Sequence, residues 1–262
     1  MKSVINSSLI LFISVILLSW NSPKGKWIIE IHEGFDMYYT SSDKVNLEEY
    51  LILINNGMSS VQMFYGDPYK SHFSIFLHPD RLSLDSTWQK DWNMPDFKSE
   101  CWMVASGTGT QFDLISPKNW ITEACEHNYL EKEKTQKLIT HELFHVYHGQ
   151  LNVSPDFSNT EGIDWFIEGL ATYASGQCDS LRISDVKTAI ENNNIPQNLD
   201  EFWTGKLRYG LSGTVVMYID YKYGRTKLKE ILSLQKKADV MLSLNTTESE
   251  LLREWKNYIL LL

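Results

Sequence analysis

The residues of this sequence best suited to chemistry lie in one short stretch, in which His141, Glu142 and His145 have the spacing H-E-x-x-H. On an α-helix, side chains four positions apart lie on the same face, one turn apart. Two imidazoles so placed can bind one zinc ion, with Zn–N bonds of roughly 2.0–2.1 Å. Glu142 then lies beside the ion, where it can accept a proton from a metal-bound water. The motif also occurs by chance, and an ordinary packed helix is the alternative.

A helix must carry this motif, and a second element must supply a third ligand. Residues 131–140 are rich in Glu, Lys, Gln and Leu and contain no Gly or Pro, which favours a helix leading into the motif. A catalytic zinc usually has three protein ligands. Glu168 is the candidate, because a carboxylate within the otherwise apolar helix predicted at 164–174 is costly unless it is paired or binds a metal. Gly169 permits close approach of another helix, and an exposed Glu168 on the helix rim is the alternative.

The other elements follow from periodicity and turn signals. Residues 83–100 read as a polar loop, whose Trp88 and Trp92 either bind sugars or apolar ligands or form a local core. Asn56-Gly57 ends a helix and Gly224 ends another, while Thr247 to Glu250 form a capping box that starts the last helix, which runs to about residue 260. We predict strands at 26–31, 73–77, 101–105 and 111–115, a loop or short helix at 119–130, and helices at 45–56, 183–191, 209–223 and 227–234.

Composition limits the class of protein. The chain has 262 residues, of which 43% are hydrophobic and 13% aromatic, and this suits one sizeable domain with a packed core. A formal net charge of −9 without a basic run argues against nucleic acid as a partner. There are three cysteines, and two interpretations are open. In one, a pair forms a disulfide, with Cys101–Cys125 the candidate, and Cys178 stays free. In the other, all three are small buried residues.

The N-terminus predicts export. Residues 9–18 are an apolar run of the length of a signal-peptide core, and they are too short for a comfortable membrane span of about 20 residues. Residues 1–22 are therefore read as a signal peptide, with an uncleaved N-terminal anchor as the alternative and the only predicted contact with a membrane. The expected location is secreted, periplasmic or at the cell surface, and the expected partners are peptide or protein substrates.

Two motifs together resemble a known family. His141-Glu-Leu-Phe-His145, followed by Trp165-Phe-Ile-Glu-Gly-Leu-Ala-Thr-Tyr173, is similar to the gluzincin zinc metallopeptidases of the peptidase MA-like family, which carry W-x-x-E-G-L-A-x-Y. The likeness covers about residues 131–262, and residues 26–130 match only as a strand-rich lobe. It implies an α+β, thermolysin-like fold in one catalytic domain, 23–262, with an α/β lobe at 23–130 whose edge strand lies beside the substrate, and a helical lobe at 131–262.

The resemblance also implies roles for residues. One zinc per chain would be bound by His141, His145 and Glu168, with Glu142 as general base and then proton donor. The oxyanion needs a second donor besides zinc, for which Tyr209 is the first candidate and Tyr173 and His148 are alternatives. His148 shares the zinc face but lies about 10 Å from His141 along the helix axis. It therefore cannot bind the same ion, and we expect it to face solvent or to support a ligand.

The pattern departs from two neighbouring families. A metzincin would have Gly and His where this chain has His148 and Leu151. An aminopeptidase N-like enzyme would show G-x-M-x-N before the zinc helix, where this chain has Ser106-Gly-Thr-Gly-Thr110.

The expected function is zinc-dependent hydrolysis of peptide bonds in exported or extracytoplasmic peptides or proteins. A non-catalytic, zinc-stabilised extracellular binding module is one alternative, but a structural zinc has no use for Glu142. A hydrolase of peptidoglycan cross-links is another, and there Trp88 and Trp92 would matter.

Overall fold

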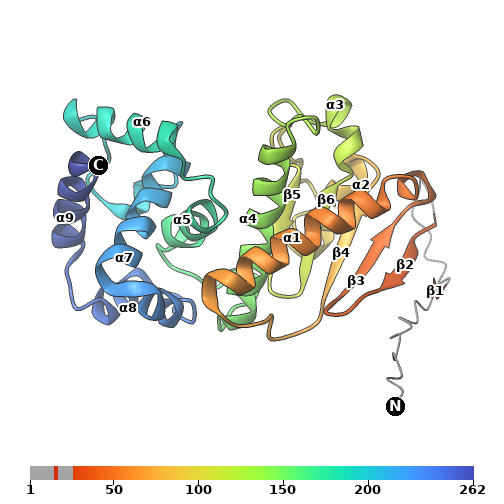
Figure 1. The fold of residues 1–262 in the computed structure, drawn as a ribbon, viewed down its shortest axis with the longest axis horizontal. Helices are drawn as coiled ribbons and strands as arrows, with labels where there is room; N and C mark the ends of the chain where they lie inside the picture. Colours follow the sequence, from red (N-terminus) through yellow and green to blue (C-terminus); the bar gives the residue numbers. More distant parts are fainter. Residues whose placement is uncertain (1–14, 17–25) are drawn as a thin grey trace, which may run out of the picture.

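The computed structural model of the protein describes residues 15–16 and 26–262, and the strands of these residues form one mixed sheet (Figure 1). The strand order is β1-β2-β3-β4-β6-β5, in which β3, β4 and β6 run parallel and the outer strands run antiparallel to their neighbours. The bounds are Val15–Ile16 for β1, Ile28–Ile31 for β2, Phe35–Tyr39 for β3, Phe73–His78 for β4, Ala105–Gly107 for β5 and Gln111–Ile115 for β6.

Helices supply the rest of the fold, which is α+β as predicted. Helix α4 packs against β5 and β6 on one side and against α5 on the other, so that it joins the sheet to the group of helices α5 to α9 (Figure 1). The bounds are Leu47–Tyr65 for α1, Arg81–Asp91 for α2, Trp120–Glu123 for α3, Lys132–Leu151 for α4, Asp164–Ala174 for α5, Ser180–Glu191 for α6, Arg208–Ile231 for α7, Lys237–Ser243 for α8 and Glu248–Leu261 for α9.

The predicted strands at 26–31, 73–77 and 111–115 are confirmed within a residue or two, but the first half of the sheet was only partly foreseen. Strand β3 was not predicted, and the strand predicted at 101–105 is wrong for all but its last residue, because β5 begins at Ala105. Strand β3 alternates buried and half-buried side chains, which is the pattern of a strand with one face on the core.

The predicted end of the first helix is wrong. Helix α1 continues through Gly57 to Tyr65, and Gly66, with φ of 76°, caps it in the left-handed conformation. A Cβ at Gly57 would lie 2.6 Å from Leu143 Cδ1 of α4. The glycine therefore allows the two helices to pack closely and does not stop the helix.

The first half of the loop predicted at 83–100 is instead helix α2. The Asp80 side chain caps it by accepting the Ser83 N–H at 2.9 Å. Trp88 is only 2% exposed and belongs to the core, whereas Trp92 stacks on it with ring centroids 4.8 Å apart and stays 37% exposed. Of the two alternatives for these tryptophans, the local core is correct for Trp88.

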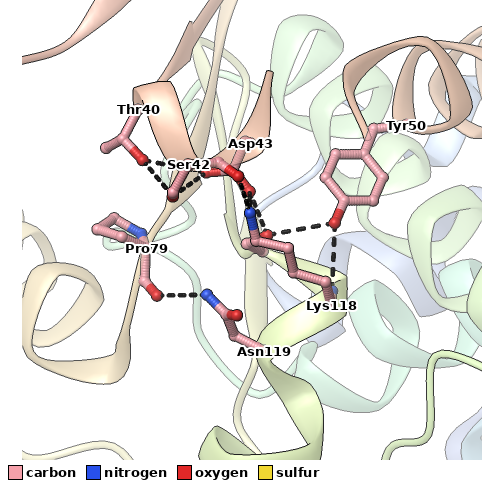
Figure 2. Close-up of polar contacts among 8 residues, drawn as sticks. Thr40, Ser42, Asp43, Tyr50, Pro79, Lys118 and Asn119 are labelled. Carbon is pink, nitrogen blue, oxygen red and sulfur yellow. Dashed lines mark hydrogen bonds and ion pairs between the residues drawn. The ribbon is translucent and has the colours of Figure 1, made fainter. Parts of the chain in front are cut away.

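The end of the sheet where the parallel strands finish carries a buried polar cluster (Figure 2). Asp43 is fully buried, and both of its carboxylate oxygens have protein partners. Oδ1 accepts a hydrogen bond from Ser116 and lies 3.2 Å from Lys118 Nζ, while Oδ2 accepts from Thr40 at 3.2 Å. The Tyr50 hydroxyl lies 3.3 Å from Ser116 Oγ and ties α1 to the same cluster. This network fixes the loops that follow β3 and β6.

Most C-terminal helices match their predictions closely, but α8 was not predicted. Helix α5 spans the predicted residues, α7 kinks at Gly224 with φ of 82°, and Thr247 and Glu250 form the predicted capping box of α9. Helix α6 starts three residues early because Asp179 caps it. The predicted signal peptide or anchor at 1–22 lies outside the described residues, apart from β1. Within the described ranges, no helix is both long and apolar enough to cross a bilayer.

Candidate metal centre

The two histidines of the H-E-x-x-H motif meet on one face of α4. His141 Nε2 and His145 Nε2 lie 3.0 Å apart, and both side chains are 7% exposed. Helix α5 brings Glu168 to the same point, where its Oε2 lies 3.4 Å from His141 Nε2 and 3.6 Å from His145 Nε2. These three residues together can hold a metal ion.

The geometry suits zinc. A tetrahedral zinc with bonds of about 2.0–2.2 Å holds its ligand atoms roughly 3.3–3.6 Å apart. The two separations from Glu168, 3.4 and 3.6 Å, lie in that range, and the two histidine nitrogens are slightly closer at 3.0 Å. Two imidazoles and one carboxylate are a donor set that zinc binds well, with a fourth position left for water or substrate. Among the described residues, only these two histidines lie within ion-pair distance of Glu168, so no Lys or Arg competes for it.

Helix α5 is held in position by the face that packs against α7. A Cβ at Gly169 would clash with the backbone carbonyl of Ser212 in α7, so the two helices approach closely at this glycine. The predicted close approach is therefore confirmed, and the partner is α7. With that face occupied, the preceding residue, Glu168, points to α4. Its side chain is 27% exposed and does not project freely into solvent, so the alternative of an exposed rim glutamate is wrong.

The charges of the centre depend on each other. Burial by itself would raise the pKa of Glu168, but the two imidazoles outweigh it and hold that pKa well below its ordinary value. Burial would lower the pKa of His145, but the Glu168 carboxylate outweighs it and raises that pKa. Each group thus stabilises the charged form of the other, and a cation at the same place would take over the role of the imidazolium.

Glu142 lies beside the centre and not in it. Burial raises the pKa of its carboxyl group, while the two imidazoles and the Gly107 N–H partly oppose that shift. Gly107 is in strand β5, and a Cβ there would clash with the Glu142 backbone carbonyl. Lack of a side chain at Gly107 therefore lets β5 lie directly on the motif helix.

One cavity of about 660 Å³ contains the whole centre. Its wall on the sheet side is β5 with the loop before it, and its wall on the helical side is α5 with residues from the start of α6 and α7. Phe157 marks the end near His145, with ring centroids 6.3 Å apart. Tyr209 marks the end near His141, with centroids 6.4 Å apart.

The three candidates for a second oxyanion donor differ in whether their side chains line the cavity. Tyr209 lines the cavity, where burial raises the pKa of its hydroxyl and the Glu168 charge adds to that shift. Tyr173 does not line it, because its hydroxyl donates to Asp220 at 2.8 Å. His148 is 1% exposed and stacks edge-on against Phe157 at 4.9 Å. The expectation that His148 faces solvent is therefore wrong, and its burial lowers its pKa to about 3.

The loop before β5 was not recognised as a cavity wall. The disulfide Cys101–Cys125 is confirmed, with Cys178 free, and it joins this loop to the segment after α3. The Arg81 guanidinium donates to the carbonyls of Glu100 and Met103, both at 2.8 Å, and to that of Glu123. The loop is thereby held in place, and its Trp102 side chain lines the cavity. The cysteine pair was the only local signal for this wall.

No protein-family model matches the chain, and no curated protein matches its sequence.

Proposed function

We propose that this protein is a zinc metallopeptidase of the gluzincin type, with a thermolysin-like arrangement of its two lobes. The observation that carries the proposal is the meeting of His141 Nε2, His145 Nε2 and Glu168 Oε2 within one cavity, with the Glu142 carboxyl group beside them. A structural zinc site would be closed by a fourth protein ligand and would have no use for an adjacent base.

The chain itself supplies a proton carrier. A zinc ion at the three ligands would supply a Lewis acid that polarises the scissile carbonyl and makes water easier to deprotonate. Glu142 takes the proton of the attacking water and delivers it to the leaving nitrogen. Burial raises the pKa of Glu142 and so strengthens its affinity for a proton. This helps Glu142 to accept the proton of water and then to act as the acid that donates it to the leaving nitrogen.

Strand β5 supports a peptide as substrate. It is the last strand of the sheet, and within the described part of the chain it pairs only with β6. Its residues Ala105 to Gly107 line the cavity, so its free edge faces the metal centre. An extended peptide can add to such an edge by backbone hydrogen bonds, which would lay a peptide bond across the centre.

Tyr209 is the proposed second donor to the oxyanion. Its raised pKa keeps its hydroxyl protonated at neutral pH, so the group can donate a hydrogen bond. It lies next to His141 on the helical side of the cavity, opposite β5.

We further propose that the protein works outside the cytoplasm. The disulfide Cys101–Cys125 holds one wall of the cavity, and such bonds persist in oxidising compartments. The apolar run at 9–18 agrees with this location.

Zinc content and hydrolysis of a mixture of quenched peptides test the proposal. We expect one zinc per wild-type chain, and in Glu142→Gln we expect retained zinc with hydrolysis reduced about 10²- to 10⁴-fold. Glu168→Ala should bind zinc weakly. The control is Glu48→Gln, an exposed glutamate of α1 away from the cavity, which should behave like wild type.

Three results would change the conclusion. Full activity of Glu142→Gln would exclude the proposed base. Zinc at one per chain without hydrolysis of any peptide would favour a binding module. Cleavage of cross-linked peptidoglycan alone would favour the cell-wall hydrolase.

A further inference from the structure

The cavity end near His141 is lined by three cationic side chains and by two carboxylates, Glu126 and Asp179, and one of the cations has no ion-pair partner in the part of the chain that the structure describes. Two lysines there are already paired, Lys134 with Glu131 and Lys137 with Glu133. Arg182 lines the same end, and within the described ranges no carboxylate side chain lies within ion-pair distance of its guanidinium. An unpaired guanidinium on a cavity wall is a ready site for an anion.

Arg182 is held ready for a ligand. Its Nη1 donates to the backbone carbonyl of Gln177 at 2.6 Å, and its own backbone N–H donates to Asp179 Oδ1 at 3.0 Å. The Asp179 carboxylate is thus engaged as the cap of α6 and not with the guanidinium. A guanidinium has five N–H donors, and the one contact with Gln177 leaves the others for a planar, two-oxygen acceptor.

A second arginine closes this end of the cavity. The Arg208 guanidinium lies over the Trp102 ring at 4.6 Å, and also near the rings of Trp203 at 5.4 Å and Tyr209 at 5.2 Å. Trp102 comes from the sheet side and Arg208 from the helical side, so the contact joins the two walls. Among the described residues Arg208 has no ion-pair partner either. A chain bound along β5 therefore meets aromatic rings and positive charge here instead of open solvent.

The distance from the metal centre is short. The Tyr209 ring lies 6.4 Å from the His141 ring, and the Arg182 guanidinium carbon lies 5.6 Å from the Tyr209 ring. An extended residue spans about 3.3 Å. These two distances bound the separation, so a group bound by Arg182 would belong to a residue within about four positions of the bond at the centre.

We infer that Arg182 binds the terminal α-carboxylate of the peptide, which makes the protein a carboxypeptidase-type exopeptidase. The inference rests on the proposed function and names its substrate class: short peptides with a free C-terminus. Water adds its hydroxyl to the acyl carbon and its proton to the released amine, so one C–N bond breaks and no other reactant is needed. The acidic residue Glu126 at this end is exposed to solvent.

Binding to an inactive, metal-loaded protein tests the inference without relying on catalysis. Zinc-loaded full-length Glu142→Gln is titrated with three probes: N-acetyl trialanine, its C-terminal amide, and the same amide with aspartate in the middle position. We expect the free acid to bind about 10- to 100-fold more tightly than the plain amide, because a charged hydrogen-bonded pair is lost with the amide. Adding Arg182→Gln should remove that difference. Adding Arg253→Gln, which removes an exposed arginine of α9, should preserve it.

Each outcome decides between the claims. Equal binding of acid and amide, or a difference that survives Arg182→Gln in a protein with unchanged far-UV circular dichroism, overturns the inference. Tight binding of the aspartyl amide would also overturn it, because the cavity would then bind an acidic side chain inside the peptide and not the terminal α-carboxylate. If wild type cleaves amides and acids equally well, the peptidase proposal stands and the exopeptidase inference fails. If zinc binds but no probe binds and no peptide is cleaved, the peptidase proposal itself fails.

Discussion

Two buried polar clusters in this protein look alike in composition and differ in what completes them. Around Asp43, a carboxylate meets an ammonium and three hydroxyls, and both of its oxygens have protein partners (Figure 2). Around His141, a carboxylate meets two imidazoles whose Nε2 atoms face each other at 3.0 Å, and His141 Nδ1 has no partner at all. The protein satisfies both carboxylate oxygens of the first cluster, whereas the second cluster leaves a buried ring nitrogen unpaired among the described residues.

The difference separates structure from function. Buried polar groups are normally satisfied within the protein, because an unpaired one costs free energy. The Asp43 cluster follows that rule and binds the strand ends together. In the His141 cluster one ring nitrogen, His141 Nδ1, has no partner within the described ranges, and the three converging ligand atoms lie inside a cavity where a cation could bind all of them. The comparison therefore predicts that variants of the first cluster change stability and variants of the second change metal binding.

The largest expected effect is stabilisation by zinc. At about 1,000 times the dissociation constant, zinc should raise the free energy of unfolding of the wild type by about 4 kcal/mol, through mass action on the folded state. His141→Leu should show a rise smaller by at least about 1.4–2.7 kcal/mol, the equivalent of a 10- to 100-fold weaker affinity, while its metal-free form unfolds much like metal-free wild type. Urea denaturation with and without zinc measures both. An equal rise in the variant would show that zinc binds elsewhere.

Asp43→Ala should act in the opposite way. Removing the carboxylate takes one hydrogen-bond acceptor from the buried Ser116 hydroxyl and the ion-pair partner from the Lys118 ammonium, and we expect a loss of about 3 kcal/mol in the free energy of unfolding. Zinc binding should not change. The matched control, Asp96→Ala at the surface, should lose less than about 0.5 kcal/mol. A weaker zinc affinity in Asp43→Ala would undo the separation of the two clusters.

Gly107→Ala tests how the sheet reaches the centre. A methyl group there has no room beside the Glu142 carbonyl, so β5 must move away from α4. We expect a loss of about 1–3 kcal/mol in stability, as for other overpacked sites, together with reduced hydrolysis. Chemical denaturation and a peptide assay measure the two effects, with Ser106→Ala as the neighbouring control. Unchanged activity would show that the position of β5 does not matter for catalysis.

The smallest effect concerns pH. Burial lowers the pKa of His148 from 6.5 to about 3, so between these values the unfolded chain binds a proton that the folded protein does not. His148 therefore destabilises the fold as the pH falls below about 6.5, by about 1.4 kcal/mol per pH unit. Metal-free wild type should lose more stability between pH 6.5 and 5 than metal-free His148→Leu. Parallel pH profiles of the two would contradict this assignment.

Local patterns explain what could be predicted. The spacing of His141 and His145 and the carboxylate of Glu168 inside a mostly apolar helix depend on neighbouring residues only, and the structure brings all three together. The capping box at Thr247 and the break at Gly224 are equally local, and both were predicted.

Long-range packing explains the misses. Gly57 was predicted to end a helix, because the sequence does not show that α4 packs closely against this glycine. The wall formed by Trp102 depends on Arg81 and on a disulfide between two cysteines that are 24 residues apart. Arg182 reaches the cavity only because of the placement of α6. The pairing of such distant segments leaves no periodic trace in either of them.

The most direct test of the central claim is a calorimetric titration of zinc into metal-free wild type, His141→Leu and Glu168→Gln. We expect one site per wild-type chain and an affinity at least about 10- to 100-fold weaker in each variant, because each removes one of three ligands. Absence of zinc binding to the folded wild type, or equal affinity in all three proteins, would contradict the account.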